Sequence, residues 1–459
     1  PGRPGLPACR FSRRKPARRW AELLPMTTLR ATEPYEISTT AALPPPAIAI
    51  SSIILSMSLI AIGNGLMFAF IPVRLAERGF SPFDAGLVVT ALSLGGMAGC
   101  LLTGALIKRV AHARAFMTLS ALVILSNAAI AVRLDLTLWM LARALYGFGI
   151  NGLFIVAQSW LNDVVENRIR GRVSALFYMA YDVSLGIGAL MLSIVGREPV
   201  AVPTLCIAFA AIAILPVGLT RLRTPPAPAT AAVAVKSAWR ISPVGLVSML
   251  VVGGLTMMIT GFVPIYATDH GFSRTDVSLV MSAMPLGMIF VQLPLGWLSD
   301  RTDRRYVLIA AAFLVALGGL LASRMEGASL GLFVLVFLVW SGPTESIFSV
   351  ARPHANGRAA SHELVALSST MLFAWSLSGF VLPGLATFLT EIFGTRAFMI
   401  LTSATAAAYG AFVLWRTLRG NPAQETGEWQ PTAAPTPLAP DLAFPGHPDA
   451  DPGPRDGEG

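Results

Sequence analysis

Twelve apolar runs, each close to the length that spans a bilayer, follow one another along this chain. A transmembrane helix needs about 20 consecutive apolar residues, so a chain built from such runs has few other ways to fold. The runs of the first half cover 48–73, 83–107, 115–133, 136–158, 173–195 and 200–219. Those of the second half cover 243–266, 276–299, 307–323, 329–350, 364–390 and 396–416. The pattern predicts an all-α membrane protein with twelve transmembrane helices in two six-helix bundles.

Composition excludes an ordinary soluble domain, because only 13% of the residues are charged and soluble domains carry about 25%. The net charge of +9 would suit a nucleic-acid ligand. However, the basic residues lie in short loops between apolar runs, as membrane topology requires, and we expect no nucleic-acid partner. Cys9, Cys100 and Cys206 form no paired motif, so the sequence predicts no disulfide framework, metal site or cofactor.

A Pro/Ala-rich linker at 220–242 divides the chain into bundles at 47–219 and 243–418. The basic segment 1–46 and the Pro-rich segment 419–459 are predicted to be disordered tails. Met26 is a candidate start, with the preceding residues translated from upstream sequence. The alternative is that those residues form a basic arm that touches anionic lipid.

The Lys and Arg residues are distributed unevenly between the loops on the two sides of the membrane that the twelve runs would cross. Fifteen fall in the loops and linker of one side, and seven fall in the loops of the other. Short loops rich in Lys and Arg stay in the cytoplasm during membrane insertion. Both termini and the linker are therefore predicted to be cytoplasmic.

The two halves repeat one another without a gap at a shift of 192 positions. Under this shift Pro72 falls on Pro264, and Asp84 falls on Asp276. Further matching pairs are Gly79 and Gly271, Ser81 and Ser273, Gly95 and Gly287, Gly104 and Gly296, and Arg109 and Arg301. A common register of Pro, Gly, Asp and Arg predicts two parallel, pseudo-symmetric repeats.

A short charged turn joins two apolar runs of the second half, and it reads Gly296-Trp-Leu-Ser-Asp300-Arg301-Thr-Asp-Arg-Arg305. Gly296 lets two helices approach closely. Asp300 can form a charge lock that gates the cytoplasmic side, either with Arg301 or Arg305 or with the start of the fifth helix near Gly171 and Arg172. Lys108 and Arg109 occupy the matching turn of the first half. The alternative is a stop-transfer cluster that only fixes topology.

This turn resembles the signature between the second and third helices of each half of major facilitator superfamily transporters. The resemblance narrows to the YcaD-like branch through several stretches across residues 48–416. They are Gly63-Asn-Gly65, Pro72–Ser81, Gly104–Arg109, Gln158–Asn162, Asn167–Arg172, Pro264-Ile-Tyr266, His354-Ala-Asn356 and Glu363–Ala366. The resemblance implies a secondary active transporter that moves a small molecule across a bacterial inner membrane by alternating access. A monomer is expected, and no nucleotide-binding motif points to ATP as the energy source.

The chain departs from the family pattern in three places. Lys108 stands where the superfamily has Asp, and Gln158 stands where an acid is expected before Ser-Trp-Leu-Asn. Arg143-Ala-Leu-Tyr-Gly-Phe-Gly149 resembles the helix 4 signature of proton-coupled members. The fifth helix, however, lacks the Gly-Pro pair of drug/proton antiporters, so proton coupling stays open.

Ionisable residues inside the apolar runs are few, and each is costly at membrane depth, which makes each a candidate functional residue. They are Arg143, Asp182 and Glu345. Asn64, Gln158 and Gln292 are candidates to line a polar pathway between the halves. For all six the alternative is a structural hydrogen bond or ion pair between helices.

Asp182 is the acid nearest the middle of the bilayer in this reading, and Arg143 on the preceding helix is its candidate counter-charge. Desolvation disfavours the charged carboxylate, so Asp182 can take up a proton on one side and release it on the other. Pairing with Arg143 is expected in one conformational state only. The alternative is that Asp182 hydrogen-bonds Tyr178 or Tyr181 as a packing feature.

Two rival functions remain at this point. A non-transporting sensor or receptor on the same fold would bind a ligand without flux and use the long C-terminal tail as its partner site. A membrane-embedded enzyme is the weaker rival, because no phosphate loop, nucleophile elbow or metal-ligand spacing is present in the sequence. We therefore predict no enzymatic activity.

Overall fold

Long helices account for almost all of the chain that this computed structural model describes, which is residues 2, 46–165, 169–196, 198–220, 233–325, 327–356, 358–359 and 363–419. The predicted tails fall almost wholly outside these residues, as does most of the predicted linker. At a few positions within the helices, Asp300 among them, the side chain also lies outside the described part.

The described residues of the first half form six helices. They are α1 (Pro46–Glu77), α2 (Pro82–Val132), α3 (Leu136–Val164), α4 (Arg170–Met191), α5 (Ala201–Ile212) and α6 (Ile214–Leu219). The second half contains α8 (Pro243–Asp269), α9 (Arg274–Arg301), α10 (Arg304–Ala322), α11 (Leu330–Asn356), α12 (Leu364–Phe393) and α13 (Ala397–Arg419). A short helix, α7 (Val235–Ile241), lies within the segment predicted as a linker.

The 51 residues of α2 are two helices joined at Ala111, whose φ of 65° and ψ of 166° are not helical. Positive φ is strained for a residue with a side chain, and here it makes the turn between two spans. Eleven described helices are long and apolar enough to cross a membrane, and α2 supplies two spans among them. The prediction of an all-α membrane protein with twelve spans is confirmed. The predicted loop at 108–114 is shorter than the sequence suggested.

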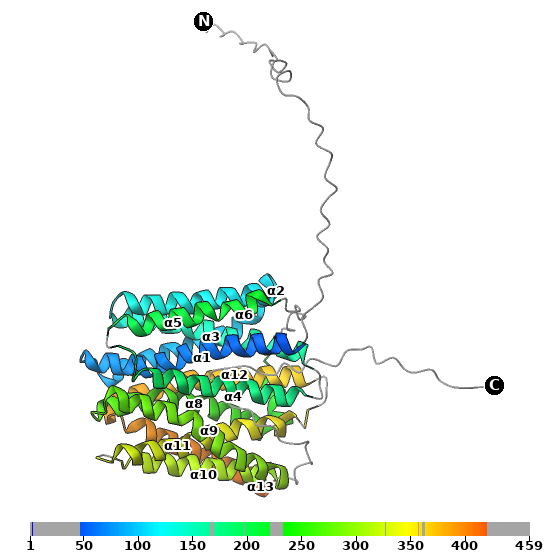
Figure 1. The fold of residues 1–459 in the computed structure, drawn as a ribbon. Coiled ribbons are helices and arrows are strands. Elements are labelled where there is room, and N and C mark those ends of the chain that lie inside the picture. The colour runs from blue at the N-terminus through cyan, green and yellow to red at the C-terminus, as the bar shows by residue number, and fades with distance from the viewer. Residues whose placement is uncertain are drawn as a thin grey trace, which may run out of the picture. The chain divides into compact units, whose positions relative to one another are not determined.

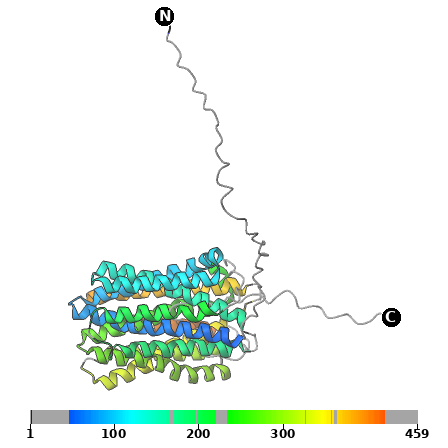
Figure 2. The same cartoon turned by 45° about the horizontal axis from the view of Figure 1, so that its top comes forward.

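The helices lie side by side in the bundle (Figure 1), and the second view keeps the same arrangement (Figure 2). We call the end where α1 begins and α13 ends the terminal face, after residues 46–52 and 413–419. The opposite end, with the turns at 77–82 and 269–274, is the distal face. The polypeptide therefore enters and leaves the bundle on the same side.

The predicted repeat recurs in the backbone at the distal face. Ser81 caps α2 and Ser273 caps α9, and each forms a capping box with the Asp three residues later. Gly79 and Gly271 precede them with φ values of 78° and 76°, which suit glycine. Two turns 192 residues apart in the sequence thus have one geometry, as two pseudo-symmetric halves require.

Glycines let the helices inside each half cross almost backbone to backbone. A Cβ at Gly65 of α1 would collide with the carbonyl of Leu185, and one at Gly188 of α4 would collide with that of Ile62. The other three crossings are α2 with α3 at Gly95 and Gly147, α8 with α12 at Gly253, and α9 with α11 at Gly287 and Gly342. Close approach of this kind is how small residues strengthen helix packing in membranes.

The two halves meet most extensively along two pairs of helices, α2 against α12 and α4 against α9. Hydrogen bonds cross both seams near the distal face. Ser278 Oγ donates to the carbonyl of Ala189 at 2.8 Å, and Arg274 Nε donates to that of Leu192 at 3.0 Å. On the other seam the hydroxyl oxygens of Thr90 and Thr387 lie 3.0 Å apart. We call these three contacts the distal contacts.

Candidate functional site

The six predicted pathway residues are all buried within the bundle. Asn64, Arg143, Gln158 and Asp182 lie in the first half on α1, α3 and α4. Gln292 and Glu345 lie in the second half on α9 and α11. Burying a polar group costs free energy unless it has a hydrogen-bond partner. The contacts of each residue therefore distinguish a structural role from a role in the pathway.

Arg143 lies between aromatic rings rather than beside an acid. Its Cζ is 4.6 Å from the centre of the Tyr146 ring and 5.4 Å from that of Phe68. The side chain is 2% exposed, and its Nη1 has no hydrogen-bond partner among the described residues. Cation–π contacts offset part of the cost of burying the charge. One guanidinium nitrogen of Arg143 is therefore not hydrogen-bonded by any described residue.

Asn64 is the second member of this group. Its Nδ2 donates to the hydroxyl of Tyr181 at 3.2 Å, while its Oδ1 has no partner in the described chain. Asn64 lies four residues before Phe68, so the two share a face of α1. We call Asn64, Phe68, Arg143, Tyr146 and Tyr181 the arginine site. Sequence reasoning missed its three aromatic members, although the spacing of Tyr146 three residues after Arg143 was a usable signal.

Asp182 on α4 is 7% exposed, and no hydrogen bond or ion pair joins it to any described residue. Neither the predicted pair with Arg143 nor the alternative bond to Tyr178 or Tyr181 is formed in this structure. Asp182 lies four residues before Gly186, which packs on the carbonyl of Ser282 in α9. The carboxyl therefore occupies the face of α4 that meets the second half.

The remaining pathway residues differ in whether their polar atoms have hydrogen-bond partners. Both amide atoms of Gln158 are buried without a hydrogen-bond partner in the described chain. Glu345 Oε1 accepts a hydrogen bond from Thr256 Oγ1 of α8 at 3.1 Å, which links α11 to α8. Gln292 is buried in α9. Glu345 therefore fits a structural hydrogen bond between helices. The side-chain amide of Gln158, by contrast, has donor and acceptor atoms that no described residue uses.

The predicted gate residues gather at the terminal face. Lys108 and Arg109 are exposed, and Gly296 is buried. Arg301 lies over the ring of Trp297, with its Cζ 3.8 Å from the ring centre. Because the side chain of Asp300 lies outside the described part, the proposed lock is neither formed nor excluded. Arg305 is buried at the start of α10.

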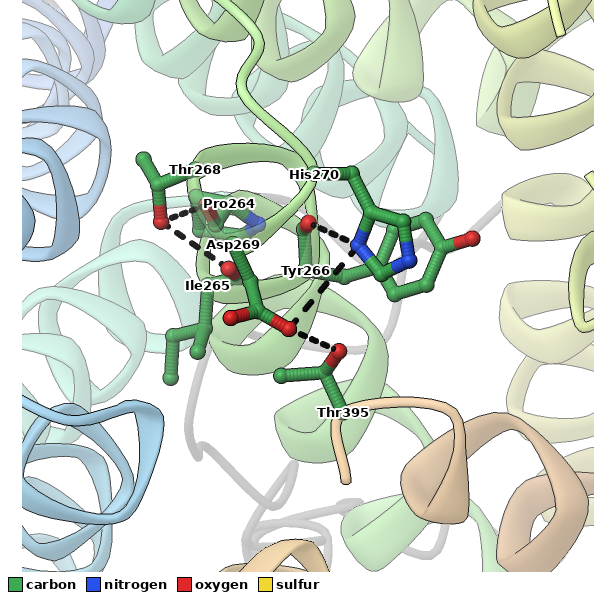
Figure 3. A network of polar contacts seen from close by, with 7 residues as sticks. All are labelled: Pro264, Ile265, Tyr266, Thr268, Asp269, His270 and Thr395. Atoms are coloured by element: carbon green, nitrogen blue, oxygen red, sulfur yellow. Dashed lines mark hydrogen bonds and ion pairs between the residues drawn. The ribbon is translucent and has the colours of Figure 1, made fainter. Parts of the chain in front are cut away.

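A polar network at the distal face ties α8 to the turn before α13 (Figure 3). Thr395 Oγ1 donates to Asp269 Oδ2 at 2.6 Å. The ring of His270 stacks on Tyr266 with 3.8 Å between centres, and its Nδ1 lies 2.9 Å from the Tyr266 carbonyl oxygen. The contacts of Asp269 and His270 thus hold the end of α8 to Thr395, and we interpret the network as a structural contact within the second half.

A family model described as Major Facilitator Superfamily matches residues 53–244 and 244–445. Among curated proteins, the uncharacterized MFS-type transporter YcaD of Escherichia coli O7:K1 is 25% identical over 367 residues. The match covers 80% of this chain and 94% of that relative. YcaD of Escherichia coli K12 (DH10B) matches with the same identity and coverage.

Two solved structures share the fold. The human organic anion transporter MFSD10 (TETRAN) has a TM-score of 0.58 at 15% identity, over 81% of this chain and all of that chain. The Escherichia coli fucose:proton symporter FucP has a TM-score of 0.54 at 15% identity, over 81% of this chain and 99% of that chain. At these identities the likeness concerns the arrangement of helices alone.

Proposed function

Because the chain belongs to the Major Facilitator Superfamily, we propose that it works as a secondary active transporter that moves a small molecule by alternating access. It is a multi-pass membrane transporter of the YcaD-like branch. In alternating access, two halves rock about a site near the middle of the membrane. The two pseudo-symmetric bundles of this chain suit that motion.

The observation that carries the proposal is the pair of unmatched charges in the first half. Arg143 and Asp182 are buried in spanning helices, and neither has an ion-pair partner among the described residues. Such groups are expensive within a membrane and mark substrate or ion pathways. A substrate that presents an acceptor oxygen to Arg143 Nη1 would satisfy the arginine site. Asp182, on the face toward the second half, is suited to carry a proton.

The distal contacts support assigning this structure to the state in which the distal face is closed. They join the halves across both seams close to that face. At the terminal face, a Cβ on Gly104 of α2 would meet no atom within 4 Å. Substrate would then reach the arginine site from the terminal face. The gate residues Gly296, Asp300, Arg301, Arg305, Lys108 and Arg109 would close that face in the opposite state.

We propose that the terminal face is cytoplasmic and that the membrane is the bacterial inner membrane, with the protein acting as a monomer. The basic loops support this orientation. Lys108, Arg109, Arg301 and Arg305 all lie at the terminal face. The bundles at 47–219 and 243–418 are the proposed moving units, and 220–242 is the proposed cytoplasmic linker.

Reporter fusions test the orientation. Fusions after Lys236 and Arg419 should report the cytoplasm, and a fusion after Arg78 should report the opposite side, because α1 separates Arg78 from the other two positions. Paired alkaline phosphatase and fluorescent protein reporters at each position give opposite readings and control for expression. A linker reporter on the external side would contradict the two-half arrangement.

Purified protein and flux measurements test the function itself. A thermal-stability screen of small molecules should identify a stabilising ligand, since binding to the folded state alone raises stability. That ligand should then move into proteoliposomes, with accumulation measured with and without a pH gradient. Binding without flux would instead support the sensor, which is the alternative function on this fold.

A further inference from the structure

Four basic side chains gather at the terminal face of the second half, apart from the arginine site. Arg304 and Arg305 begin α10, His354 lies in the last turn of α11, and Arg358 follows that helix. Arg305 is 7% exposed and His354 is 1% exposed, while Arg358 is half-buried. We call these four residues the basic cluster. Charged side chains are rarely buried to this degree without an anion close by.

One described carboxylate acts on Arg358, and its effect is smaller than that of a neighbouring cation. Asp303 is the carboxylate whose charge acts on Arg358, and it also caps α10 by accepting a hydrogen bond from the Arg305 backbone N–H at 2.9 Å. Burial, and next the charge of Arg305, lowers the pKa of Arg358. Arg416 of α13 acts in the same direction. At Arg358 the repulsion from Arg305 thus exceeds the attraction that Asp303 supplies.

Two buried nitrogens of the cluster lack partners. Arg305 Nε and His354 Nε2 make no hydrogen bond to any described residue. His354 also lies within the electrostatic influence of Arg304, Arg305 and Arg358. An unmade hydrogen bond on a buried donor destabilises the protein, and more so when the donor is charged. A single anion with several acceptor oxygens would serve both nitrogens.

The surroundings favour a lipid as the carrier of that anion. Tyr306, next to Arg305, is exposed, and so are Phe313 and Leu317 further along α10. On the neighbouring α13, Trp415 and Leu418 are exposed as well. These apolar side chains offer a surface for acyl chains beside the basic cluster. Basic groups between spanning helices on the cytoplasmic side bind anionic headgroups.

We propose that the basic cluster is a binding site for a phosphate group, supplied by an anionic phospholipid headgroup at the terminal face. Arg305 and His354 would donate hydrogen bonds to its oxygens, and Arg358 would supply further charge. Charge-assisted bonds of this type are the strong ones. A free phosphate ion shares this chemistry, and the experiment separates the two sources.

The test measures the melting temperature of the full-length protein in detergent as phosphatidylglycerol or phosphatidylcholine is added. Phosphatidylglycerol should raise the melting temperature by roughly 2–4 °C relative to phosphatidylcholine, as a ligand at roughly 100 to 1,000 times its dissociation constant does for a chain of this length. Arg305→Gln and, separately, Arg358→Gln should lose at least half of that difference. Arg324→Gln removes one exposed charge at the distal face of the same half and should keep all of it.

Equal effects of the two lipids on the wild-type protein would overturn the proposal. So would full retention of the difference in both cluster variants. Inorganic phosphate, tested alone, should give a smaller shift than the lipid, and an equal shift would keep the site but remove the lipid as its source. Arg358 is half-buried, so Arg358→Gln is the less disruptive substitution. It still tests the proposal if Arg305→Gln fails to fold.

Discussion

Replacement of Asp182 with asparagine is expected to abolish proton-driven accumulation of the substrate while leaving substrate binding intact. Asp182 is buried without a partner in the described chain, on the face of α4 that meets the second half. Rocking of the halves along the α4–α9 seam therefore changes its surroundings directly. Asparagine keeps the size and polarity of the side chain but cannot carry a proton. Accumulation in proteoliposomes with an imposed pH gradient should fall to the level of simple equilibration.

The matched variant for this experiment is Asp182→Glu, which keeps a titratable carboxyl at the same place and should retain part of the gradient-driven accumulation. Substrate exchange without a gradient should continue in both variants, because neither removes a group of the arginine site. If the asparagine variant accumulates substrate with the pH dependence of the wild type, Asp182 is not the proton carrier. Wild-type transport indifferent to the pH gradient would remove protons from the mechanism altogether.

Replacement of Gly95 with alanine should strongly destabilise the first half. A Cβ at this position would collide with the backbone carbonyl of Ala144, and a backbone atom cannot turn aside as a flexible side chain can. The crossing of α2 and α3 must then widen, against the matching close contact that Gly147 makes with Leu92. Overpacking costs about 1–3 kcal/mol, and we expect the upper end of that range here. The measurements are folded yield in membranes and melting temperature after purification.

Gly104 provides the control on the same helix, because a Cβ there would meet no atom within 4 Å. Gly104→Ala should match the wild type in both measurements. The two substitutions add the same methyl group to α2, so a difference between them reports the helix crossing and not the loss of glycine. Equal stability of the two variants would mean that α2 and α3 are further apart than described.

The fold was predictable from the sequence because hydrophobic length and repeated capping residues are local signals. The runs marked the spans, and the register that pairs Ser81 with Ser273 and Asp84 with Asp276 marked the repeat, which recurs as two capping boxes. The turn at Ala111 was not predictable, because an alanine with positive φ has no signature in the sequence.

The charged residues of the candidate site were predictable from the sequence, but the side chains that they contact were not. Charge in an apolar run marked Arg143 and Asp182, but the pattern does not say which neighbours a long side chain will meet. Opposite charge suggested that the two would pair, whereas Arg143 lies between Phe68 and Tyr146 in this structure. Likewise Arg301 lies over Trp297. Arginine stacks on aromatic rings as readily as it pairs with acids, and spacing alone does not separate the two outcomes.

The glycine crossings have a consequence for how such a protein can change over evolutionary time. Two backbone-to-backbone helix crossings in each half make that half stiff, so a substitution inside one half mainly changes stability. The seams at α2–α12 and α4–α9 are instead held by a few hydroxyl and guanidinium bonds. We therefore expect substitutions that change the timing of the cycle to lie at those seams. Residues facing the arginine site remain free to diversify toward new cargo without disturbing either the framework or the motion.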